Sequence, residues 1–139
     1  MFPGQGAQYT GMGQEIYETE PVAKEIYDKA SSILQRDICK LCFLAEQEDL
    51  NQTENAQIAI SVTSLALAAV LRKKGIQADV ALGLSLGEYT SLIDAGYVTL
   101  EEGLKLLQQR GNLMANLVPH EEYAMLAVIG LNSKCIEDI

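Results

Sequence analysis

Apolar residues recur at helical spacing along the first part of the chain. Val22, Ile26, Ala30 and Ile33 repeat at three- and four-residue intervals after a proline, which is favourable at the first position of a helix. This pattern predicts a helix over residues 21–34. Similar patterns predict further helices over residues 13–18, 38–47, 86–95 and 100–114.

The longest helical pattern lies between residues 55 and 74, and its apolar character extends nearly all round. A helix of this kind is expected to be buried. Arg72, Lys73 and Lys74 occupy its last turn and Gly75 follows, which matches the helix dipole and a glycine cap.

The apolar part of this pattern covers residues 56–71 and is interrupted by polar side chains. It is shorter than the ~20 residues needed to cross a bilayer, so we expect no membrane span. The first residues, "MFPGQGAQ", have neither the basic nor the long apolar region of a signal peptide. These features predict a cytoplasmic protein.

Two short apolar runs have the length of buried strands. They are "DVALGL" at residues 79–84 and "YAMLAVIG" at residues 123–130. Since helical patterns surround both runs, the expected fold class is α/β. A capping box, Thr99 with Glu102, is expected to open the helix between them.

The chain has the length of one ordinary domain, 139 residues, and an acidic balance of 10 Lys+Arg against 19 Asp+Glu. A formal net charge of -9 leaves no excess of cations to neutralise phosphates, which argues against general nucleic-acid binding.

Cys39 and Cys42 form a single CxxC pair. With no second Cys or His pair this is weak evidence for zinc, and the surrounding residues do not show the strand-to-helix context of a redox motif. Their spacing favours packing on one helix face; redox or metal chemistry is the alternative. We expect no metal site.

A serine turn follows the first predicted strand. In "GLSLG", residues 83–87, Ser85 lies between two glycines that would let a strand and a helix pack closely. This is the pattern of a nucleophile elbow, in which the next helix offers free N–H groups to an oxyanion. The alternative is a glycine-flanked turn with a solvent-facing serine.

Four segments occur in one order along the chain: "FPGQGAQYTGMG", "AQIAISVTSLAL", "GLSLGEYTSLIDAG" and "QQRGNLM". Together they closely resemble the family of malonyl-CoA:acyl carrier protein transacylases, and the resemblance covers essentially the whole chain. It implies acyl transfer in fatty-acid biosynthesis. Coenzyme A thioesters and acyl carrier protein would be the partners, and no cofactor is implied.

The resemblance implies a role for five residues. Ser85 matches the acyl-accepting serine, and the backbone N–H groups of Gln5 and Leu86 match the oxyanion hole. Arg110 matches the arginine that grips the malonyl carboxylate, a role that suits a planar guanidinium. Gln57 matches a glutamine lining the active site.

The resemblance also implies a hydrolase-like parallel sheet with flanking helices over residues 1–120. Residues 121–139 would begin a ferredoxin-like small subdomain, so the chain is expected to be the N-terminal part of such an enzyme. Two departures stand out. Leu84 occupies a position where family members commonly have histidine, and the family's catalytic histidine would lie downstream of this chain. His120, the one histidine of the chain, matches no functional residue of the family and is expected to be a solvated loop residue.

Other readings stay open. The chain could be a catalytically inactive fragment, or a piece that binds acyl carrier protein, with the cationic residues 72–74 as a docking patch. A serine esterase or another acyltransferase would share the elbow, but would have no need for Arg110 beside an acyl pocket.

Overall fold

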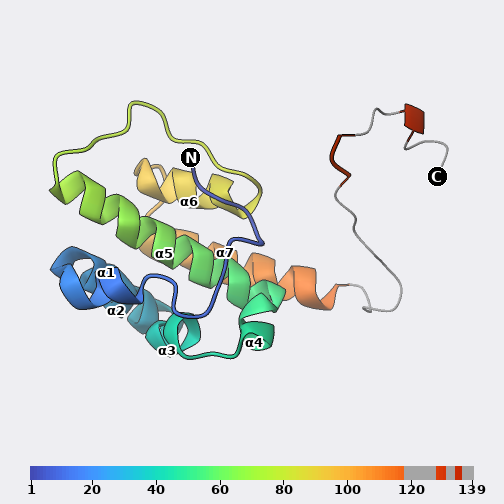
Figure 1. Ribbon diagram of the computed structural model, residues 1–139, viewed down its shortest axis with the longest axis horizontal. Coiled ribbons are helices and arrows are strands. Elements are labelled where there is room, and N and C mark those ends of the chain that lie inside the picture. Colours follow the sequence, from blue (N-terminus) through green and yellow to red (C-terminus); the bar gives the residue numbers. More distant parts are fainter. Residues whose placement is uncertain (118–127, 131–133, 136–139) are drawn as a thin grey trace.

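The computed structural model describes residues 1–117, 128–130 and 134–135. Its helices form a layered bundle in which α5 runs through the middle, with α2 and α7 against it (Figure 1). The helices are α1 (Gln14–Thr19), α2 (Pro21–Leu34), α3 (Ile38–Phe43), α4 (Gln47–Asn51), α5 (Thr53–Lys73), α6 (Leu86–Asp94) and α7 (Leu100–Asn116).

The core lies around α5, as the apolar pattern of that helix predicts. Most of its residues between Ala56 and Val70 are buried, and they pack against buried side chains of α2 and α7. A cluster of three aromatic rings, Tyr17, Tyr27 and Phe43, joins α1, α2 and α3, with ring centroids 5.2 to 5.6 Å apart.

Of the helices the structure describes, α5 alone has the length and apolar composition to cross a membrane. It has 21 residues, more than the apolar stretch counted from the sequence, but 61% of its most apolar 18-residue window is buried inside the protein. Its composition is accounted for by its place in the core.

The end of α5 has the expected glycine cap. Gly75 has a φ of 83°, and the N–H groups of Gly75 and Ile76 donate to the carbonyls of Arg72 and Leu71 at 2.9 and 3.0 Å. This paired arrangement is a Schellman motif, in which glycine takes the left-handed conformation without a Cβ penalty.

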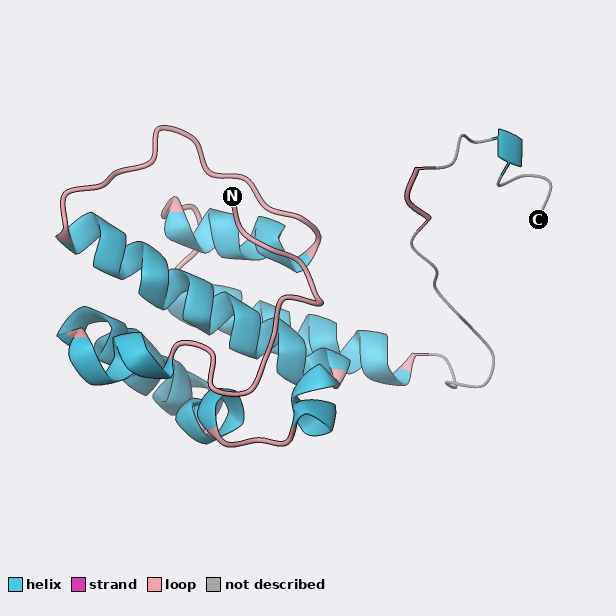
Figure 2. Cartoon of the chain, viewed as in Figure 1, coloured by secondary structure: helices cyan, strands magenta, loops and turns pink. Residues whose placement is uncertain are grey.

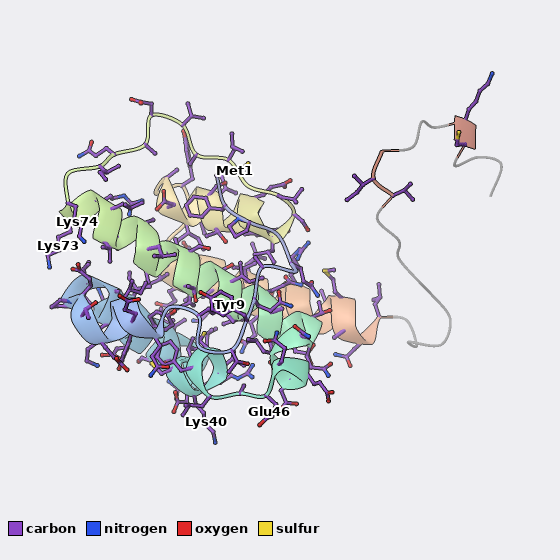
Figure 3. All side chains as sticks on the ribbon, viewed as in Figure 1. Met1, Tyr9, Lys40, Glu46, Lys73 and Lys74 are labelled. Atoms are coloured by element: carbon purple, nitrogen blue, oxygen red, sulfur yellow. The ribbon has the colours of Figure 1, made fainter. Side chains whose placement is uncertain are left out.

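Each of the three cations at this end of α5 has a carboxylate partner. Arg72 pairs with Asp94 of α6, while Lys73 and Lys74 lie 3.7 and 3.1 Å from Glu20. The two lysines are labelled in Figure 3. These pairs offset much of the positive charge of the docking patch suggested by the sequence.

One predicted helix is wrong in extent. Instead of a single helix over 38–47, α3 ends at Phe43 and α4 begins at Gln47. The N-terminal loop explains the break, because Gly11 N–H and Thr10 Oγ1 donate to the carbonyls of Cys42 and Ala45, both at 2.8 Å. Residues distant in sequence thus satisfy the carbonyls at the end of α3.

The strand expected at residues 79–84 is not formed. Residues 74–85 are a long connection between α5 and α6, and the described part of the chain consists of helices and loops (Figure 2). A single parallel bridge joins Phe2 to Gly83, with Phe2 N–H donating to Leu82 O at 2.8 Å and Leu84 N–H donating to Phe2 O at 3.1 Å. A strand requires a neighbouring strand with a continuous ladder of hydrogen bonds, and a single bridge is not such a ladder. The second expected strand lies mostly outside the described residues.

Cys39 and Cys42 lie on α3 and are not joined in a disulfide. Cys42 is fully buried in the core and Cys39 packs against the same cluster. Burial raises the pKa of the Cys42 thiol from 9.0 to about 12. The packing interpretation therefore agrees with the structure, and an inert thiol is expected here.

Candidate active site

Ser85 lies directly before α6, where the chain turns sharply into the helix. Its φ of 53° and ψ of -108° are unfavourable for a residue with a Cβ. Ser85 is exposed, while Leu86 and Gly87 behind it are buried. The local backbone thus has the strained geometry of a nucleophile elbow that presents its hydroxyl to solvent.

Two glycines make this turn possible. A Cβ added at Gly83 would overlap the carbonyl carbon of Gly87, and a Cβ at Gly87 would come within 2.8 Å of the carbonyl oxygen of Pro3. Three segments of backbone therefore meet at the elbow: the connection before it, the first turn of α6, and the N-terminal residues.

A buried pair of hydroxyl groups ties α6 to α5. Ser61 and Thr90, which are 0% and 1% exposed, share a hydrogen bond of 2.8 Å. Since neither group can reach water, this bond fixes the helix that carries the elbow against the core helix.

Arg110 comes to the serine from α7. Its Nη2 donates to Ser85 Oγ at 3.0 Å, and its Nη1 donates to Gln57 Oε1 of α5 at 2.5 Å. Three residues singled out in the sequence are thus brought together from three separate elements. The guanidinium and the serine are close enough to contact the two ends of one short acyl group.

The amide of Gln57 is completely buried. Its oxygen accepts from Arg110, and its Nε2 donates to Met114 Sδ at 3.4 Å. Because arginine can only donate, the amide oxygen must face Arg110, and the thioether is left as a weak acceptor for the amide nitrogen. In this structure Gln57 orients Arg110, and its own side chain is shielded from solvent.

Met114 and Tyr89 were not recognised in the sequence. The Tyr89 ring lies 5.4 Å from the guanidinium carbon of Arg110, in cation–π range. Tyr89 follows Ser85 by one helical turn, and Met114 follows Arg110 by one turn. Residues four positions apart lie on the same face of a helix. This spacing from Ser85 and Arg110 was the sequence signal that could have identified Tyr89 and Met114.

The two expected oxyanion donors lie near the serine turn. Leu86 is the first residue of α6, and its N–H has no hydrogen-bond acceptor among residues 1–117. Gln5 follows Gly4, where a Cβ would lie 3.1 Å from the carbonyl oxygen of Leu84, so the two segments touch. The Gln5 side chain turns elsewhere, with Nε2 donating to Thr53 Oγ1 at 3.3 Å.

His120, expected to be a solvated loop residue, lies outside the described residues. Among residues 1–117, 128–130 and 134–135, no group of three or more His, Cys, Asp or Glu side chains could hold a metal ion.

A strained, exposed serine before a helix N-terminus, with a cation on its oxygen, is an arrangement typical of sites for acyl transfer to serine. The class of protein defined by this geometry is a serine-dependent acyltransferase or hydrolase. The chain belongs to the family described as the acyl transferase domain, which matches residues 1–138.

Two curated relatives have the same name, malonyl CoA-acyl carrier protein transacylase. The Bacillus subtilis (strain 168) protein is 37% identical over 139 residues, and the Staphylococcus aureus (strain MRSA252) protein is 40% identical over 139 residues. Each alignment covers 100% of this chain and 44% of the relative. The chain thus spans less than half the length of these relatives.

Solved structures agree with this membership. The malonyl CoA-acyl carrier protein transacylase of Clostridium perfringens has a TM-score of 0.81 and 42% identity, covering 85% of this chain and 37% of that one. The acyl-carrier-protein-S-malonyltransferase of Bartonella henselae has a TM-score of 0.91 and 34% identity, covering 99% and 45%. Both neighbours are acyltransferases of the α/β class.

Proposed function

We propose that Ser85 accepts a malonyl group from malonyl-CoA and passes it to the phosphopantetheine thiol of acyl carrier protein. The observation that carries this proposal is the hydrogen bond of 3.0 Å between Arg110 Nη2 and Ser85 Oγ. A cation beside the nucleophile suits an acyl group that ends in a carboxylate, because a guanidinium can hold both of its oxygens.

In the first half of the reaction, Ser85 Oγ attacks the thioester carbonyl and its proton goes to a general base. The carbon–sulfur bond then breaks, and coenzyme A leaves as the thiol after taking up a proton. In the second half the thiol of acyl carrier protein attacks the serine ester and the serine oxygen regains its proton. The N–H groups of Leu86 and Gln5 would hold the oxyanion in both halves.

We propose that the general base comes from outside the described residues. Serine at its ordinary pKa is a weak nucleophile without a base, and loss of such a member costs several orders of magnitude in rate. The reaction would use no metal or other cofactor, because the serine, the base and the arginine supply its chemistry.

The proposed fold contains a sheet in addition to the described helices. We propose a hydrolase-like parallel sheet flanked by these helices, with the Phe2–Gly83 bridge as one of its contacts. Residues 1–120 would belong to this large subdomain, and residues 121–139 would begin a ferredoxin-like small subdomain. The apolar, exposed side chains of the connection, such as Ile76, Val80 and Leu82, fit a segment that packs in a sheet.

The proposed partners follow from the names of the relatives. The two curated relatives are named for malonyl-CoA and acyl carrier protein, and one neighbouring structure is a malonyl-transacylase in complex with an acyl carrier protein of a type II polyketide synthase. We place the reaction in fatty-acid biosynthesis in the cytoplasm, with no nucleic acid or membrane involved.

The test is intact mass spectrometry after incubation with malonyl-CoA, with acetyl-CoA as the competing substrate. A mass gain of one malonyl group that is absent in Ser85→Ala supports the proposal. Labelling by acetyl-CoA at an equal rate would favour a general acyltransferase or esterase. If the folded chain gains no mass, imidazole is added as an external base, and continued absence of an adduct counts against catalysis by these 139 residues.

A further inference from the structure

Arg110 has a second consequence for Ser85 besides recognising a substrate. Its Nη2 donates to the oxygen that must attack the thioester. A serine oxygen has two lone pairs, and a cationic donor on one of them withdraws electron density from the nucleophile. The observed contact therefore occupies one lone pair of the attacking oxygen.

The same guanidinium is anchored at its other nitrogen. Nη1 donates at 2.5 Å to Gln57 Oε1, which is on a fully buried side chain, and the Tyr89 ring lies beside the guanidinium. Nη1 is therefore the fixed end, and Nη2 is the end that can exchange partners through a small rotation. Ser85 is exposed, so an incoming group can reach this bond from solvent.

A carboxylate competes well for Nη2. The bond from Arg110 to Ser85 has one ionised partner, whereas a bond from a guanidinium to a carboxylate has two and can be bidentate, which adds energy and geometric specificity. A carboxylate on the acyl group would take over Nη2 and leave the serine oxygen with both lone pairs. An acyl group that ends in a methyl would leave the bond in place.

We propose that Arg110 is a latch on Ser85, pivoting on Gln57, and that the carboxylate of a dicarboxylic acyl thioester releases it. This proposal rests on the proposed function and deepens it. Selectivity would then come from activation of the nucleophile as well as from binding. The substrate class is any short acyl thioester whose far end is a carboxylate.

The test measures the affinity of free malonate, which requires no acyl transfer. Malonate is titrated at low ionic strength into the wild-type chain, Ser85→Ala and Ser85→Gly, with binding followed by NMR chemical shifts. If the carboxylate must displace the serine, removing the hydroxyl should tighten binding by about tenfold or more, the scale of one hydrogen bond to a charged group. Glycine also relieves the positive φ of Ser85, so this variant should fold if the alanine variant does not.

The matched control is Ser91→Ala on the same helix. Ser91 Oγ donates to Glu88 O at 2.7 Å and does not contact Arg110, so its loss should leave malonate affinity unchanged. Arg110→Ala should abolish binding. Unchanged or weaker binding in both Ser85 variants overturns the latch, while a malonyl adduct on wild-type Ser85 would still support the proposed function. Absence of any binding that depends on Arg110 would count against both.

Discussion

Gly83 and Gly87 approach each other so closely across the serine turn that a Cβ on the first would overlap the carbonyl carbon of the second. The neighbouring atoms are backbone and cannot rotate away. The space for Ser85 at the apex therefore depends on two residues that carry no side chain, and the position of Ser85 is a property of the backbone packing.

We expect Gly83→Ala to destabilise the protein by about 4 kcal/mol or more, because backbone must move to admit the methyl group. Gly103→Ala is the matched control, since an added Cβ there meets side chains, those of Ile93 and Val98, in place of backbone, and the substitution raises helix propensity. Urea denaturation followed by circular dichroism measures both. Equal stability of the two variants would show that the elbow is not tightly packed.

Arg110→Lys should lose malonyl transfer almost as fully as Arg110→Ala. A lysine ammonium lacks the planar fork with which Arg110 can bind Gln57 and a carboxylate at the same time. We therefore expect the rate of malonyl adduct formation on Ser85 to fall by about 100-fold or more. Stopped time courses read by intact mass provide the rate. A lysine variant that retains the full rate would mean that charge alone is sufficient.

The capping box predicted at the start of α7 is present in full. Thr99 Oγ1 accepts from Glu102 N–H at 3.2 Å, and Thr99 N–H donates to Glu102 Oε2 at 3.2 Å. Thr99→Ala should cost about 1 kcal/mol of unfolding free energy. Thr19→Ala, at the last residue of α1, is the control and should cost less.

The same capping box should respond to acid. Hydrogen bonds from Thr99 lower the pKa of Glu102 below its usual 4.5. A carboxylate whose pKa is lowered on folding stabilises the fold above its unfolded pKa and loses that contribution as pH falls through the folded value. The difference in stability between wild type and Glu102→Gln should therefore shrink below about pH 4.5. A constant difference down to acid unfolding would contradict this assignment.

Cys42 should resist alkylation in the folded protein. Burial raises the pKa of its thiol to about 12, so iodoacetamide at pH 8 should modify the exposed Cys135 and leave Cys42 intact. Peptide mapping by mass spectrometry locates the modified residues. Rapid alkylation of Cys42 in folded protein would mean that α3 opens readily.

The raised pKa of Cys42 also sets a direction for stability at high pH. Between pH 9 and about pH 12 the unfolded chain releases the thiol proton while the folded chain keeps it. The folded state then binds more protons, so the free energy of unfolding falls as pH rises through this window. Cys42→Ala should show a shallower decline, measured by urea denaturation at stepped pH values.

Most helices could be predicted from the sequence because their signals are local. Pro21, the apolar repeat after it and the capping residues of α7 lie within a few residues of the elements they define. The break between α3 and α4 could not be predicted, since it depends on Thr10 Oγ1 and Gly11 N–H donating to carbonyls more than thirty residues away. The strand expected at residues 79–84 is not formed in the described part of the chain for a related reason: its apolar run is real, but a ladder requires partners that composition does not reveal.

The amino-acid sequence by itself determined where most of the helices lie and that Ser85 stands between two glycines, because these depend on neighbouring residues and on backbone sterics. Only the tertiary structure decided that Arg110 meets Ser85 and Gln57, across separations of 25 and 53 residues that no local pattern encodes. The physical reason is that the packing of α5 against α6 and α7 sets the three side chains at hydrogen-bonding distance, and such packing depends on the whole core at once.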